Sequence, residues 1–393
     1  MRTRSVRPAA LTVAAAALLA GCTAGDADPT LPAIADVQLH PVGDPGRWFS
    51  EAYADGLGGR YSTMNTLCGV GDGVAVETLD ASAPDFGTQV QARSLDSGAV
   101  LWTLPDLSCA EGAVREGAAM LSTGPGESAW RLVDARSGAT REEFALTDPD
   151  IGAGRVTARV DDLWVVESEQ QLVGIGPRPE GGTGRVWQRE LGTRVEVTPL
   201  GDGMLGVSSG LDGRLSVVDG RTGEVRYETT GVDVGSALTW ASDGFVLRVN
   251  QSDPEYAFFD LDGEEIDRTV GESQYPFAPR GSEGVTLPIA DHVAAGKVTA
   301  VARDGAPALF EDRGRHYTRA GQIDLRGSSV LLSDVSADGS MIIVDEPGGE
   351  GFIVIDAEGE DVLRWSPPYS ELRVEAGYLV VSDLNVTDVL LPR

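Results

Sequence analysis

The chain is poor in the residues that most often carry catalysis. It has only three cysteines and three histidines, the latter being His40, His292 and His316. No two cysteines are adjacent, and neither Cys68 nor Cys109 has a second cysteine or a histidine at metal-ligand spacing. The sequence therefore offers few candidates for a general base and predicts no metal site.

Positive charge is also scarce. The chain has 61 Asp and Glu residues against 31 Lys and Arg, which gives a formal net charge of −30. The average field of such a chain repels nucleic acid and anionic lipid headgroups. We therefore expect no nucleic-acid partner.

Long apolar runs are confined to the N-terminus. Arg2, Arg4 and Arg7 precede an uncharged run from Ala9 to Ala20, and no later apolar stretch reaches the roughly 20 residues that a membrane-spanning helix needs. A positively charged start followed by a short apolar run is typical of a secretory signal peptide. We assign residues 1–21 to this signal peptide.

The signal peptide leads into Leu-Ala-Gly-Cys at positions 19–22, which resembles the lipobox of bacterial lipoproteins. Two or three acyl chains on Cys22, each contributing about 0.8 kcal/mol per buried methylene, would form a stable anchor. We predict lipidation of Cys22, a tether over residues 22–32, and a location on the extracytoplasmic face of the cell membrane. An ordinary signal peptide with an incidental cysteine is the alternative.

The two remaining cysteines form an even pair. If Cys22 carries lipid, Cys68 and Cys109 are left together in an oxidising compartment, which favours a disulfide between them. Two separate buried thiols are the alternative, because the sequence does not fix the geometry of a bridge.

One pattern recurs along the chain. An alternating apolar stretch leads to an aspartate, a few polar residues with glycine, and a second alternating stretch. Asp and Gly supply turn conformations and the alternation gives each strand one buried face, so each copy predicts a β-hairpin. The copies are ARSLDSGAVLWTL (92–104), RLVDARSGATREEF (131–144), LSVVDGRTGEVRYE (215–228), AFFDLDGEEIDRTV (257–270) and FIVIDAEGEDVLRW (352–365).

A further strand is predicted ahead of each hairpin, after a small or acidic turn. These turns are marked by Gly73, Gly117, Asp162, Gly203, Gly244, Gly339 and Gly377, at steps of 44, 45, 41, 41, 95 and 38 residues. The step of 95 leaves room for one more, degraded copy near residues 285–312. Units of about 43 residues are typical of four-stranded propeller blades. We predict an all-β fold: a single propeller over residues 33–393 with eight blades, or seven as the alternative.

A propeller must close, because an open ring would expose the edges of its strands. The last unit, LRVEAGYLVVSDLNVTDVLLP, reads as about two strands. We therefore expect an N-terminal strand, residues 34–42 (IADVQLHPV), to complete the last blade of a monomeric ring.

The turn D-A-x-[S/T]-G, followed by a strand that often carries tryptophan, resembles the repeat of quinoprotein-like propellers, the family named for pyrroloquinoline quinone. Asp134 to Gly138 and Asp219 to Gly223 match best, and the resemblance covers most of residues 65–390. It implies an eight-bladed ring in which tryptophans pack between blades. The tryptophans concerned are Trp102, Trp187 and Trp365.

The resemblance also bears on activity. Some members of the family are alcohol or sugar dehydrogenases; others bind no quinone and act as scaffolds, among them a lipid-anchored component of the outer-membrane β-barrel assembly machinery. The enzymes need a bound Ca²⁺ and a base for the alcohol proton, and they often carry adjacent cysteines or a C-x-x-C-H haem motif, which this chain lacks. We therefore predict no cofactor and no catalytic residue.

Two further motifs have a plainer interpretation. Residues 206–210 (GVSSG) match the G-x-S-x-G nucleophile pattern, but they stand between two predicted strands instead of at a strand-to-helix elbow. Residues 260–267 (DLDGEEID) faintly resemble a calcium loop and are read as a solvated hairpin turn.

These observations favour a non-enzymatic, surface-anchored lipoprotein whose propeller presents its faces and loops to a protein partner in the cell envelope. Two alternatives stay open. One is the binding of a small ligand, such as a metal, a glycan or a drug, in the central channel. The other is a quinone-dependent or hydrolytic enzyme.

Overall fold

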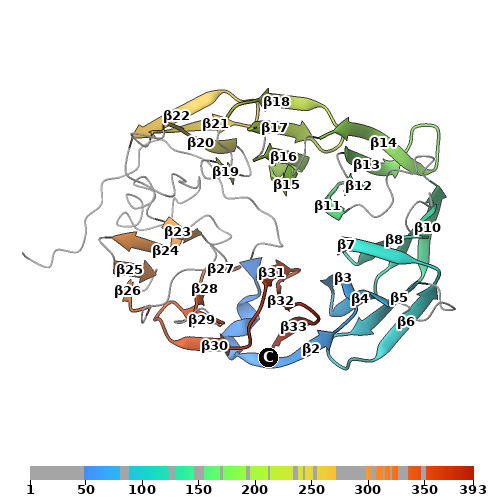
Figure 1. Ribbon diagram of the computed structural model, residues 1–393, viewed down its shortest axis with the longest axis horizontal. Helices are drawn as coiled ribbons and strands as arrows, with labels where there is room; N and C mark the ends of the chain where they lie inside the picture. The colour runs from blue at the N-terminus through green and yellow to red at the C-terminus, as the bar shows by residue number, and fades with distance from the viewer. Residues whose placement is uncertain are drawn as a thin grey trace, which may run out of the picture.

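The computed structural model is a ring of eight β-sheets that follow one another around a common axis in chain order (Figure 1). The all-β propeller with eight blades is therefore confirmed. The structure describes residues 48–79, 88–123, 129–145, 155–168, 171–191, 195–210, 213–232, 238–241, 244–250, 255–270, 298–301, 307–312, 315–318, 321–325, 335–346 and 351–393. The signal peptide, Cys22, the tether and the stretch 34–42 lie outside these residues.

Blades one to four are each built from four consecutive antiparallel strands, with the first strand nearest the axis (Figure 1). Blade one comprises β3 (Thr66–Gly71), β4 (Val74–Leu79), β5 (Gln89–Ser94) and β6 (Val100–Pro105). Blade two comprises β7 (Ser108–Arg115), β8 (Ala118–Ser122), β9 (Ala129–Asp134) and β10 (Thr140–Ala145). Blade three comprises β11 (Arg155–Val160), β12 (Leu163–Ser168), β13 (Gln171–Pro177) and β14 (Thr183–Glu190). Blade four comprises β15 (Val195–Pro199), the 3-10 turn η3 (Gly201–Gly203), β16 (Met204–Ser209), β17 (Arg214–Asp219) and β18 (Val225–Thr229).

Blades five to eight complete the ring. Blade five comprises β19 (Leu238–Ala241), β20 (Gly244–Asn250), β21 (Glu255–Asp260) and β22 (Glu265–Val270). Blade six comprises β23 (Val298–Val301), β24 (Pro307–Asp312), β25 (Arg315–Thr318) and β26 (Gly321–Ile323). Blade seven comprises β27 (Val335–Ser336), β28 (Met341–Asp345), β29 (Phe352–Asp356) and β30 (Asp361–Trp365). Blade eight comprises β31 (Glu371–Glu375), β32 (Tyr378–Ser382), β33 (Thr387–Pro392) and an N-terminal strand, β2 (Leu57–Thr63).

The repeat seen in the sequence maps onto the blades. All five predicted hairpins are the third and fourth strands of a blade, and the degraded copy near 285–312 overlaps the first two strands of blade six. The marker residues lie between first and second strands, or at the start of the second strand in the case of Gly244. In these turns Asp72 and Gly73 have φ of 50° and 75°, and Glu116 and Gly117 have φ of 47° and 69°. Two positive φ values in succession are what a two-residue hairpin of type I′ requires, which explains the Asp-Gly and Glu-Gly pairs.

Antiparallel pairing gives the ring two different faces. The short turns between first and second strands and between third and fourth strands lie on one face, which we call the turn face. The links between second and third strands, and those from one blade to the next, lie on the opposite face, which we call the loop face. In the described part of the chain, no helix is long and apolar enough to cross a membrane.

Blade eight joins the two ends of the fold. β2 pairs antiparallel with β33, with Tyr61 opposite Val389, and supplies the outermost strand of the sheet. An N-terminal strand therefore closes the ring as predicted, and the strand that pairs with β33 is residues 57–63, whereas the predicted stretch 34–42 lies outside the described residues. The last unit also has three strands instead of two, because residues 383–386 turn the chain tightly with a hydrogen bond from Asp383 N–H to the Val386 carbonyl (2.9 Å).

The segment ahead of β2 runs between blades seven and eight from the inner to the outer edge of the ring. β1 (Trp48–Phe49) pairs parallel with β27 beside the axis, and the 3-10 helix η1 (Glu51–Asp55) leads outward to β2. Phe49 and Tyr53 are fully buried there. The Tyr53 hydroxyl donates to the Leu390 carbonyl (2.5 Å) and accepts from the Leu379 N–H (3.1 Å). One phenol group thus bridges β32 and β33, and its burial raises the pKa of Tyr53.

Replacing Tyr53 with phenylalanine should lower the free energy of unfolding by about 1–3 kcal/mol, because it leaves a buried carbonyl and a buried N–H without their partner. Tyr378→Phe is the matched control, since Tyr378 is only partly buried and its hydroxyl has no hydrogen bond among the described residues. Denaturant unfolding of both variants measures the difference. Equal stability of the two variants would contradict the bridging role.

Candidate interaction surface

Tryptophans on the outer strands of blades one and three form hydrogen bonds with the following blade. The Trp102 indole N–H of blade one donates to the Ala135 carbonyl of blade two, and the Trp187 indole N–H of blade three donates to the Gly220 carbonyl of blade four, each at 2.9 Å. The acceptor lies 33 residues after the tryptophan in both joints. The packing expected for these two tryptophans is therefore present, and a hydrogen bond fixes it.

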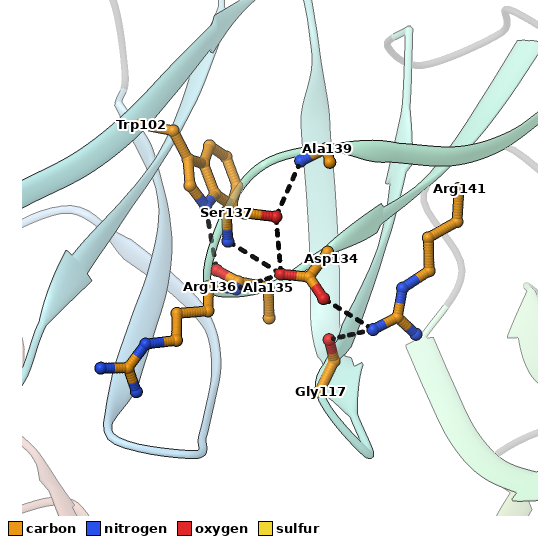
Figure 2. A network of polar contacts seen from close by, with 8 residues as sticks. All are labelled: Trp102, Gly117, Asp134, Ala135, Arg136, Ser137, Ala139 and Arg141. Carbon is orange, nitrogen blue, oxygen red and sulfur yellow. Dashed lines mark hydrogen bonds and ion pairs between the residues drawn. The ribbon is translucent and has the colours of Figure 1, made fainter.

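The turn that receives Trp102 is held by its own aspartate (Figure 2). Asp134 Oδ1 accepts from the N–H and the hydroxyl of Ser137, both at 2.8 Å, while Oδ2 pairs with Arg141 at 2.8 Å. The hydrogen bond from Arg141, with those from Ser137, holds the pKa of Asp134 well below its usual range. Gly138 completes the turn with φ of 69°, and a Cβ there would lie 2.6 Å from Cγ of Trp102. The D-A-x-S-G motif is thus a socket for an indole ring.

Other joints use the same position with different side chains. Tyr227 packs against Gly263, and Ile323 against Gly359, where an added Cβ would lie 2.0 Å and 3.3 Å from the respective side chain. Trp365 faces blade eight, where the chain ends replace the third-to-fourth turn. Its indole nitrogen is buried without an acceptor among the described residues, and the guanidinium of Arg60 lies 6.0 Å from its ring centroid. The joint at ring closure therefore differs from the others.

The cysteine pair lies on the innermost strands. Cys68 on β3 and Cys109 on β7 are joined as a disulfide, with their Cα atoms 5.7 Å apart. Beyond Cys109 the ladder of β7 is interrupted until Val114, and Gly112 in this bulge has φ of 73°. The bridge therefore ties blade one to blade two next to the axis.

Charged residues also gather on the inner strands of blades eight and one. Arg373 pairs with Glu375 (2.7 Å) and Glu371 (3.3 Å). The second oxygen of Glu375 accepts the Val70 N–H of β3 at 3.0 Å. Burial by itself lowers the pKa of Arg373, but the neighbouring carboxylates outweigh burial and raise it. This cluster is internally paired and joins the inner edges of two blades.

The motifs that suggested chemistry are accounted for by the blades. Ser208 of the G-x-S-x-G match lies inside strand β16 and on no strand-to-helix elbow. Asp260 accepts the N–H groups of Asp262 (3.0 Å) and Glu264 (2.8 Å), so this segment is the third-to-fourth turn of blade five. His316 lies in β25, and His40 and His292 lie outside the described residues.

Two apolar side chains stand out on the loop face of blade eight. Met64, in the link from β2 to β3, is 82% exposed, and Leu384, in the turn from β32 to β33, is 88% exposed. The register pairs Thr63 with Thr387, so the two loops leave the sheet side by side. Val386, 37% exposed, lies in the same turn as Leu384. No signal in the sequence distinguishes these residues, because isolated apolar residues in loops are common.

Buried hydrogen bonds hold the Met64 loop in place. Glu77 of β4, with a side chain only 1% exposed, accepts from Thr63, from Gln91 (2.5 Å) and from Arg93 (3.0 Å). Burial alone would raise the pKa of Glu77, but these hydrogen bonds, that of Thr63 first, lower it, so the group stays ionised. Thr63 Oγ1 in turn accepts the Asn65 N–H at 3.0 Å. Met64 is therefore presented by a rigid link, which reduces the entropy lost on binding.

The chain matches no model of a known protein family and no curated protein by sequence. Among solved structures it is similar to BamB from Moraxella catarrhalis (16% identity, 85% of this chain and 98% of that chain covered, TM-score 0.46). It is also similar to the computationally designed protein Ika8 (10% identity, 88% and 99% covered, TM-score 0.45). A third is the β-propeller domain of Swd1 from Myceliophteria thermophila (11% identity, 85% and 98% covered, TM-score 0.39).

Gly138→Ala tests the socket. Alanine at φ of 69° is strained by about 1–2 kcal/mol, and the clash with Trp102 should cost about 1–3 kcal/mol more. Gly98→Ala is the matched control, because Gly98 holds the same turn position in blade one with φ of 67° and nothing within 4 Å of an added Cβ. Denaturant midpoints give the difference, and equal losses would show that the indole contact contributes nothing.

The disulfide closes a separation of 41 residues. Because a disulfide lowers the conformational entropy of the unfolded chain, its removal should lower the free energy of unfolding by about 2–4 kcal/mol. The double variant Cys68→Ala, Cys109→Ala should be destabilised by this amount, and reductant should destabilise the wild type but not the variant. Two free thiols titrating in unreduced, denatured protein from the native compartment would contradict the bridge.

Proposed function

We propose that this protein is a lipid-anchored scaffold of the cell envelope whose loop face at blade eight binds a protein partner. The observation that carries the proposal is the pair Met64 and Leu384, both more than 80% exposed on loops that adjoin at the paired ends of β2 and β33. Exposed apolar residues occur singly on most proteins, but a cluster on one rigid edge is typical of an interaction site. Methionine is also enriched at the centres of interfaces.

The partner we infer has an apolar pocket with basic residues around it. The exposed side chains of Met64 and Leu384 need an apolar pocket from which water is excluded. The net charge of −30 favours a partner with a cationic surface, because it attracts that surface as the two proteins approach. An anionic membrane surface is disfavoured by the same charge. The mechanism is binding: the ring holds the two loops at a fixed distance, so little conformational freedom is lost in the complex.

The anchor and the lack of catalysis rest on the sequence. Arg2, Arg4 and Arg7, the apolar run and Cys22 support export and lipidation at the extracytoplasmic face. The missing adjacent cysteines support a non-enzymatic role. Turnover in a dye-reduction assay, after reconstitution with pyrroloquinoline quinone and Ca²⁺, would contradict that role.

Site-directed photo-crosslinking on whole cells tests the surface. A photoreactive amino acid placed at position 64 or 384 should give an adduct of the same defined mass. Position 101 is the control, because Leu101 is 42% exposed in the outer strand of blade one, away from these loops. Leu384→Asp should remove the adduct formed from position 64 without changing the melting temperature, and Cys22→Ala should abolish both lipid labelling and the adduct.

Two results would overturn the proposal. The first is the same set of adducts from positions 64, 384 and 101, which would indicate random collisions. The second is an adduct with lipid alone from positions 64 and 384, which would mean that these side chains meet the membrane.

A further inference from the structure

A cleft of about 420 Å³ lies between blades three and four. It is formed at the loop-face ends of β14, β16, β17 and β18 together with the start of β15. This volume falls within the range of about 300–1,000 Å³ that is usual for small-molecule sites. We call it the blade-three/four cleft and define it by Arg189, Leu191, Val195, Ser209, Arg214 and Glu228.

The cleft contains a guanidinium group that has no partner among the described residues. Acidic residues outnumber basic ones by 61 to 31, and most described arginines form an ion pair. Arg214 is half-buried and forms neither an ion pair nor a side-chain hydrogen bond with the described residues. Its Nε is completely buried and meets no acceptor within the part of the chain that the structure describes. A buried donor of a charged group loses free energy unless an acceptor meets it, so this group favours an anionic ligand.

The walls around Arg214 supply two further kinds of contact. Ser208 and Ser216 line the floor with exposed fractions of 7% and 5%, and place hydroxyl-bearing side chains in a sheltered position. Leu191 and Val195 add an apolar wall. The floor suits a carboxylate held by a guanidinium and hydroxyls, and the wall suits a short aliphatic group.

The rim carries negative charge. Arg189 is engaged with the Gly223 carbonyl (3.1 Å) and lies 4.0 Å from Glu228. Glu190, also at the rim, is exposed and has no ion pair among the described residues. Because Arg189 pairs with only one of the two carboxylates, the entrance keeps a net negative charge, which repels a doubly charged anion such as phosphate but attracts an ammonium group.

From these contacts we propose that the blade-three/four cleft binds a small aliphatic zwitterion of the amino-acid class. The carboxylate of the ligand pairs with Arg214, its ammonium group faces Glu190 and Glu228, and its side chain packs on Leu191 and Val195. This site is separate from the loops of blade eight and does not depend on the scaffold role.

Calorimetric titration of the folded protein tests the site with L-leucine as the probe. Leucinamide, which lacks the carboxylate, and 4-methylpentanoate, which lacks the ammonium group, are the matched ligands, and inorganic phosphate is the anion control. We expect L-leucine to bind and each of the others to bind at least about tenfold more weakly, the loss typical of a missing charge-assisted hydrogen bond.

Arg214→Gln should weaken L-leucine binding by at least about tenfold, again the value of one charge-assisted contact. Arg136→Gln is the matched control, because Arg136 is exposed in the socket turn of blade two and lies outside the cleft. Val195→Trp reduces the space in the cleft and replaces none of its charged residues, so it should also weaken L-leucine binding. This second variant keeps the test decisive if Arg214→Gln unfolds. Melting curves establish which variants are folded.

Three results would overturn the proposal. One is the absence of L-leucine binding to the wild type. Another is equal binding of phosphate and L-leucine, which would mean unselective attraction to an arginine. The third is unchanged L-leucine binding in folded Arg214→Gln or Val195→Trp, which would place the ligand elsewhere.

Discussion

The pairing of β2 with β33 is the interaction on which the ring depends. Each of the other seven sheets takes its four blade strands from one stretch of chain, whereas blade eight needs strands from both ends of the fold. Buried polar contacts support this pairing: the Tyr53 hydroxyl bridges β32 and β33, and Glu77 accepts from Thr63 at the end of β2. Such contacts are costly when half-formed, so they favour one register of closure over others.

The joints between blades show how much variation a propeller tolerates. A tryptophan with an indole hydrogen bond, a tyrosine and an isoleucine all occupy the position that faces the turn of the next blade. The glycine opposite them is the constant element, since its positive φ and missing side chain provide the space. Blades with similar sockets can therefore differ in their loops, and the two sites proposed above use this freedom at separate positions on the loop face.

The propeller architecture could be predicted from the sequence, but the exposed loops of blade eight and the blade-three/four cleft could not. The spacing of Asp-Gly turns predicted eight blades, because those turns need positive φ that few other residues adopt. The closing strand was missed because Leu57–Thr63 contains two glycines and polar residues and shows little apolar alternation. The cleft could not be foreseen, because Arg214 and Leu191 come from different blades. That the Arg214 guanidinium has no partner among the described residues becomes apparent only when the two blades pack together.

Closure also sets the order in which the chain can fold. β1 and β2 leave the ribosome ahead of every blade, yet their partners Val335 and Pro392 are made about 290 and 335 residues later. Blades one to seven can acquire their own hairpins as they emerge, whereas residues 48–63 stay without their sheet until the last strands arrive. The N-terminal segment is therefore the first part of the fold to be synthesised and the last to pair with its sheets. A factor that keeps the newly made chain open would act by binding this segment.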